Sequence, residues 1–207
     1  YKGISPILAA VLVVAFTTVV TMCMVDGITK KSVAAMLGTI IGVVFSGAFA
    51  LIFGQVTSIT GYNVSDIENL VYVGEMTDIK IGELLFAGIL IASLGAVMDV
   101  GMSIASTLNE LKEQNPQMML KELFQSGMNV GRDMMGTMTN TLILAFTGGS
   151  INTLVFIFAY NYEYQQVINM YSVGIEIMQG LSSSLGVIMA VPVTSWIAAF
   201  LYSKNQK

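Results

Sequence analysis

Residues 94–141 read LGAVMDVGMSIASTLNELKEQNPQMMLKELFQSGMNVGRDMMGTMTNT, and the predicted fold depends on this stretch. Both of its ends are apolar, and each carries an unexpected carboxylate, Asp99 in the first and Asp133 in the second. A short amphipathic segment with much of the chain's internal charge lies between them. This arrangement indicates two membrane helices joined by a polar connection. We expect the remaining chain to be the scaffold that holds these two helices together.

The composition and the spacing of apolar residues indicate an integral membrane protein. Hydrophobic residues make up 55% of the 207-residue chain and charged residues 11%, whereas soluble domains are about 25% charged. The apolar residues gather in runs of about twenty, the length of helix that crosses a ~30 Å hydrocarbon core. Because backbone polar groups in lipid need internal partners, we predict that these runs are helices.

Several kinds of chemistry lack the residues that would carry them. The chain has no His and a single Cys23 in an apolar run, so the commonest metal ligand and general base are missing. The Met residues lack the regular short spacing of thioether copper sites and are expected to fill the core. We therefore expect no metal site and no cofactor. The net charge of −4, without a basic patch, argues against nucleic-acid binding.

The apolar runs predict one transmembrane domain over residues 1–207, with five spans at 4–25, 33–56, 83–107, 132–147 and 180–202. Residues 116–129 have one apolar and one charged side, which predicts a helix in the plane of the cytoplasmic interface. The apolar run 151–160 is too short to cross alone and is expected to lie half buried at the external surface.

Small side chains recur every four residues along the second predicted span, at Gly38, Gly42, Ser46, Ala50 and Gly54. This spacing places them on one helix face, and we call them the small-residue ridge below. A face of small residues lets two helix backbones approach closely in lipid. The ridge therefore predicts packing inside the bundle, with a contact between copies as the alternative.

The basic residues predict the orientation in the membrane. With five spans, the nine Lys and Arg residues fall unequally on the two sides of the membrane. Lys2 and Lys80 fall on one side; the other side holds Lys30, Lys31, Lys112, Lys121, Arg132, Lys204 and Lys207. The positive-inside rule then places the N-terminus outside and the C-terminus in the cytoplasm. Because Tyr1 is preceded by no initiator Met or signal peptide, we expect missing upstream sequence or processing.

Asp99 is the first candidate functional residue. It shares one helix face with Ser103, Ser106 and Glu110, which follow at steps of four, three and four residues. Asp99 lies eight residues before Thr107, so roughly 12 Å inside the predicted span. A carboxylate there costs at least ~2.5 kcal/mol unless it is protonated, paired or hydrated. Three interpretations stay open: a titrating or ion-coordinating group, a polar clamp between two helices, and a group that contacts substrate or takes part in catalysis.

The fourth span offers polar partners for Asp99. Asn140 lies about seven residues, or ~10 Å, from the predicted cytoplasmic start of this span, which matches the depth of Asp99. We predict that Asp99 faces Thr137, Asn140 or Thr141 and that Gly136 lets the two helices approach.

Asp133 has a simpler expected role. It follows Gly131 and Arg132 at a predicted helix start, so we expect it to cap that helix and to pair with Arg132. The predicted depths of Asp99 and Asp133 differ by roughly 10 Å. We therefore do not expect the paired acids of an intramembrane hydrolase, and no enzyme activity is predicted.

Two long motifs, LGAVMDVGMSIASTLNELKEQNP at 94–116 and LFQSGMNVGRDMMGTMTNTLILAF at 123–146, resemble the YibE/F family of bacterial membrane proteins. The likeness covers essentially the whole chain; further matches are KKSVAAMLGTIIGVV at 30–44, GELLFAGILIASLGAVMD at 82–99 and VPVTSWIA at 191–198. The resemblance implies a multi-pass protein of the bacterial cytoplasmic membrane. Members are often longer at the N-terminus, with an earlier span and an external region.

The arrangement also looks like half of a resistance-nodulation-division (RND) permease or of SecD/SecF. Gly95 and Asp99 form a G-x-x-x-D motif, and Glu110 follows eleven residues after Asp99. The large external loop typical of those proteins is missing. Because such halves work in pairs, the likeness implies a homo-oligomer.

The sequence thus predicts an all-α integral membrane protein, a transporter or permease-like protein coupled to protons or ions through Asp99. The alternative is a non-transporting structural or accessory subunit of a membrane complex. The expected partners are the lipid bilayer and further copies of the chain.

Overall fold

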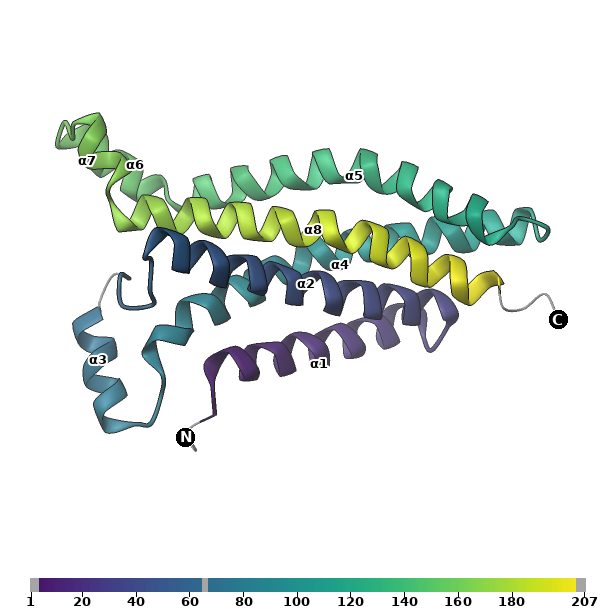
Figure 1. The fold of residues 1–207 in the computed structure, drawn as a ribbon, viewed down its shortest axis with the longest axis horizontal. Coiled ribbons are helices and arrows are strands. Elements are labelled where there is room, and N and C mark those ends of the chain that lie inside the picture. Colours follow the sequence, from purple (N-terminus) through teal and green to yellow (C-terminus); the bar gives the residue numbers. More distant parts are fainter. Residues whose placement is uncertain (1–3, 65–66, 204–207) are drawn as a thin grey trace.

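The computed structural model describes residues 4–64 and 67–203, and these residues form a bundle of long helices without strands (Figure 1). The helices are α1 (Pro6–Asp26), α2 (Lys30–Thr57), α3 (Ile67–Met76), η1 (Ile81–Glu83), α4 (Leu84–Gln114), α5 (Leu120–Gly149), α6 (Ile151–Ala159), α7 (Tyr164–Ile168) and α8 (Tyr171–Ser203). The short helices α3, α6 and α7 lie at one end of the bundle, and the α1–α2 and α4–α5 turns lie at the other.

Four helical segments of the described chain are long and apolar enough to cross a membrane: Pro6–Asp26, Lys30–Thr57, Ile81–Gln114 and Tyr171–Ser203. A fifth crossing arises if α5 and α6 count as one span with a bend of 56° between them. The predicted all-α membrane fold is therefore confirmed. Neither α6 nor α7 has a buried residue.

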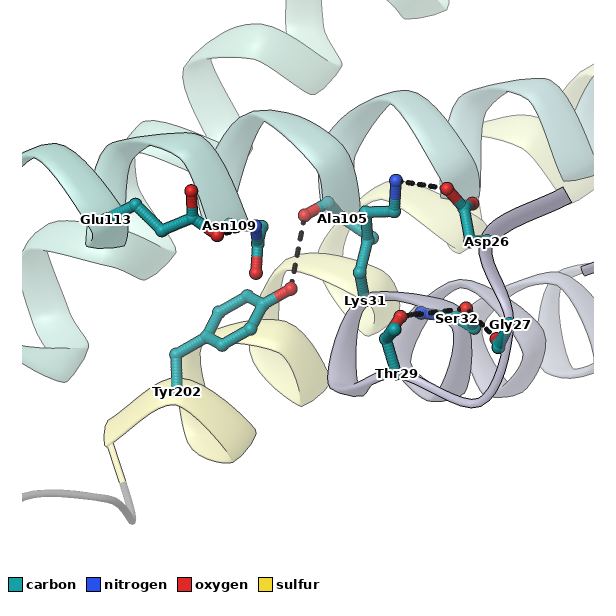
Figure 2. Close-up of polar contacts among 9 residues, drawn as sticks. All are labelled: Asp26, Gly27, Thr29, Lys31, Ser32, Ala105, Asn109, Glu113 and Tyr202. Carbon is teal, nitrogen blue, oxygen red and sulfur yellow. Dashed lines mark hydrogen bonds and ion pairs between the residues drawn. The ribbon is translucent and has the colours of Figure 1, made fainter. Parts of the chain in front are cut away.

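The α1–α2 turn is fixed by polar contacts (Figure 2). Gly27, with φ +67°, ends α1, and Thr29 caps α2 by accepting a hydrogen bond from the backbone N–H of Ser32 at 3.2 Å. The Ser32 hydroxyl donates to the Gly27 carbonyl at 2.7 Å, and Lys31 pairs with Asp26. These contacts hold the first two helices antiparallel.

The core lies where α8 packs against α2, α4 and α5. All five residues of the small-residue ridge lie on α2 and are buried. A Cβ atom on Gly42 would lie 2.7 Å from Val97 Cγ1 and 2.8 Å from Ala190 Cβ, and one on Gly186 would lie 2.7 Å from Ser46 Cβ. The ridge therefore brings α2 into close contact with both α4 and α8.

The structure corrects the prediction of a separate interfacial helix over 116–129. α5 runs without a break from Leu120 to Gly149, so that segment and the predicted span 132–147 belong largely to one helix. Leu123, Gly127 and Gly131 are buried. Because this apolar face continues into the core, the first turns of α5 pack inside the bundle.

Other boundaries also differ from the prediction. α4 continues to Gln114 rather than ending near 107, and α8 begins at Tyr171 rather than near 180. Arg132 is the thirteenth residue of α5 and does not lie in a loop. Three residues used for the orientation, Lys2, Lys204 and Lys207, lie outside the described residues.

Candidate functional site

Asp99 lies at the centre of α4, with fifteen residues of the helix before it and fifteen after it. That is roughly 22 Å of helix on each side, compared with the roughly 12 Å that the predicted span end at Thr107 leaves on the C-terminal side. Its side chain is exposed on the face of α4 that points away from the buried residues. Ser103 and Ser106 follow on this face and are half-buried, and Glu110 is exposed near the end of the helix.

The predicted contact between Asp99 and α5 is wrong within one chain. Among the described residues no hydrogen bond joins Asp99 to Thr137, Asn140 or Thr141, which are all exposed. The Thr141 hydroxyl instead donates to the Thr137 carbonyl at 2.9 Å, within α5. Periodicity shows which residues share a face but not where that face points.

Gly136 is also not the point where α4 and α5 approach, because a Cβ atom there would meet nothing within 4 Å. The close approach lies nearer the α4–α5 turn. A Cβ atom on Gly127 would lie 3.0 Å from Leu108 Cδ1, and one on Gly131 would lie 3.2 Å from Ile104 Cδ1.

The prediction that Asp133 caps a helix is wrong as well, because α5 begins thirteen residues earlier with Met119 at its N-cap. No ion pair between Arg132 and Asp133 occurs in the described part of the chain, and both side chains are exposed. In the register set by Gly127 and Gly131, Asp133 lies about 5 Å from the level of Asp99, less than the predicted depth difference.

Exposed residues form a stripe along α5 opposite its buried face. We define the α5 outer stripe as Asn129, Arg132, Gly136 and Asn140, which follow at steps of three, four and four residues. Three of the four have side chains that donate hydrogen bonds. The sequence showed these polar residues, but it placed Arg132 at the helix start rather than inside a membrane helix.

A cluster of buried oxygens lies between α2, α4 and α8, and the sequence alone does not predict it. The three nearest atoms to a Cβ built on Gly101 are Thr39 Oγ1 at 3.0 Å, the Ala35 carbonyl oxygen at 3.4 Å and Thr194 Oγ1 at 3.7 Å. Thr39 and Thr194 are fully buried, and neither hydroxyl has a hydrogen-bond partner among the described residues.

The Thr39→Val variant is expected to be as stable as the wild type, or more stable by about 1 kcal/mol, because it removes a buried hydroxyl without a partner while keeping the shape. Thermal unfolding of the purified protein in detergent measures the change. Thr18→Val is the control: its hydroxyl donates to the Val14 carbonyl at 2.7 Å, so this variant should lose stability. A clear loss in Thr39→Val would contradict the assignment.

A groove of about 340 Å³ lies between α5, α6 and α8. Its walls are mostly apolar, and its only charged lining residue is Glu176, which is half-buried. The groove suits a hydrocarbon chain better than a polar solute. Asp99 does not line it.

The comparison with protein families finds one match for nearly the whole chain. A family model described as YibE/F-like protein matches residues 1–204. Among curated proteins and among solved structures, no match was found.

Proposed function

We propose a function for a chain that belongs to the YibE/F family: a permease-like membrane protein that couples movement across the membrane to a proton or small cation at Asp99. The observation that carries the proposal is the place of Asp99, midway along a spanning helix and outside the bundle's core. None of the described ion pairs includes it. A carboxylate in the middle of a spanning helix must be protonated, hydrated or covered by another protein surface. Each of these three states suits a group that exchanges an ion.

The packing of the core supports an ion path along the outer surface of the bundle rather than through the centre of one chain. At Gly38, a Cβ atom would lie only 1.9 Å from Thr194 Oγ1, and one on Gly42 would lie 2.8 Å from Ala190 Cβ. Helices packed this closely leave no passage between α2 and α8. The outer face of α4 is therefore the better candidate for a conducting surface.

The proposed orientation follows from the described lysines. Lys30 and Lys31 lie at the α1–α2 turn and Lys112 and Lys121 near the α4–α5 turn, at the same end of the bundle (Figure 1). Lys80 lies beside η1, away from both turns. The positive-inside rule favours a bacterial cytoplasmic membrane with the two turns in the cytoplasm, the N-terminus outside and the C-terminus inside.

A non-transporting subunit is the second candidate. It is favoured by the groove described above, which is lined by residues other than Asp99. In this alternative Asp99 only holds the protein to a neighbour in the membrane.

The Asp99→Asn variant tests the choice between the two candidates. Purified protein is reconstituted in liposomes, and proton uptake driven by a potassium diffusion potential is followed with an internal pH dye, with and without Na⁺. Wild-type protein should exceed empty liposomes, and Asp99→Asn should fall to their level because an amide does not titrate.

Glu110→Gln is the matched control, since this exposed carboxylate lies on the same face near the helix end, and it should retain the flux. Elution volume and unfolding temperature check that both variants fold. Transport would be abandoned in favour of the second candidate if wild-type protein gave no flux above empty liposomes, or if Asp99→Asn kept the wild-type rate.

A further inference from the structure

We infer that a second copy of this chain covers the outer face of α4, with Asp99 of one copy placed over Gly136 and between Arg132 and Asn140 of the other. The inference deepens the proposed function, because it names what surrounds Asp99, but it does not require transport. It rests on two exposed faces of the same chain and on their matched depth.

The first face is a line of small residues on α4. Gly88, Ala92 and Gly95 lead to Asp99 at steps of four, three and four residues, and all four are exposed. A Cβ atom on Gly88 or Gly95 would meet nothing within 4 Å. Among the described residues, these glycines therefore make room for no other part of the chain, in contrast to Gly42. In lipid, such a line lets another helix approach closely.

The second face is the α5 outer stripe, and its chemistry complements that of Asp99. The Arg132 guanidinium and the Asn140 amide are donors, whereas an ionised carboxylate only accepts. Neither side chain has a hydrogen bond or ion pair within the described residues. Gly136, between them, leaves open space where a neighbouring helix can approach.

The depths of the two faces agree. α4 and α5 run antiparallel, with Gly131 beside Ile104 and Gly127 beside Leu108. Continuing this register by five residues brings Asp99 level with residue 136 and Gly95 nearly level with Asn140. Arg132 and Asn140 then lie about 6 Å to either side of the Asp99 level.

A second copy is the occupant that this geometry favours. Copies of one protein share one orientation in the membrane, so residues at equal depth within a chain are also at equal depth between chains. Both halves of the contact, the acceptor on α4 and the donors on α5, are present and exposed in this chain. A contact between copies pairs the Asp99 carboxylate with the Arg132 guanidinium and covers both. Either charged group alone in lipid would cost free energy.

Disulfide trapping in native membranes tests the contact. In a Cys23→Ser background, a Gly95→Cys copy is co-expressed with an Asn140→Cys copy that carries a different tag, and mild oxidant is added. The mixed cells should give a disulfide-linked pair containing both tags. Leu12→Cys, at an exposed position on α1, replaces Gly95→Cys in the control and should give several-fold less.

Each further outcome decides the inference. If Gly95→Cys copies link to one another rather than to Asn140→Cys copies, α4 meets α4 and the inference is overturned. A mixed yield no higher than the Leu12→Cys control overturns it as well. Adding Arg132→Gln to the Asn140→Cys copy should lower the mixed yield several-fold, while Lys121→Gln should not. Because the readout is a disulfide, a loss of transport leaves this test unaffected.

Discussion

The Gly42→Val variant is expected to lose the folded protein or to be destabilised by more than ~3 kcal/mol, at the upper end of the cost of overpacking. A first carbon at this position already lies 2.7 Å from Val97 Cγ1 and 2.8 Å from Ala190 Cβ. Two further methyl groups must push α2 away from α4 and α8 together. The yield of monodisperse protein and its unfolding temperature measure the effect.

Gly148→Val is the control for this variant, because a Cβ atom on Gly148 would meet nothing within 4 Å. It should be close to the wild type in yield and in unfolding temperature. Equal effects of the two substitutions would mean that glycine matters at position 42 for a reason other than the close approach of three helices.

The Leu123→Ala variant is expected to cost about 2–5 kcal/mol, the range for truncating a buried leucine. Leu123 is fully buried in the cluster that also contains Leu108 and Ile104. A helix lying in the headgroup plane would lose far less, because its apolar face would be only partly covered. Thermal or denaturant unfolding therefore distinguishes the continuous α5 from the interfacial helix that the sequence predicts.

Leu120→Ala provides the comparison, since Leu120 lies one turn away and is 36% exposed. We expect it to cost less than half as much as Leu123→Ala. A mild effect at both positions would show that the beginning of α5 does not pack in the bundle.

The membrane helices were predictable because hydropathy and helix length are linked in lipid. The residues at which the helices begin and end were less predictable. Lys112 and Glu113 belong to α4, and Lys121 and Glu122 belong to α5, whereas hydropathy predicts that a span ends before such charged residues. Hydropathy marks where a segment leaves the hydrocarbon, whereas a helix continues for as long as its backbone bonds and its partners allow.

The candidate site was predictable only in part. The sequence showed that Asp99, Ser103 and Ser106 share a face and that this carboxylate lies within a span. It could not show that the face points outward, because both sides of α4 carry small residues that would suit a helix contact. The buried oxygens of Thr39 and Thr194 were missed because they meet only after α2 and α8 pack.

The place of α8 in the chain has a consequence for biosynthesis. The helix that α2, α4 and α5 share as a packing partner follows all three in the chain, so it leaves the ribosome after them. Until it enters the bilayer, Gly38 lacks its neighbour Thr194 and Ser46 lacks its neighbour Gly186. Other glycines of α2 pack against α4 and do not depend on α8 alone. The core of the bundle therefore stays incomplete until α8 is inserted against the helices made before it.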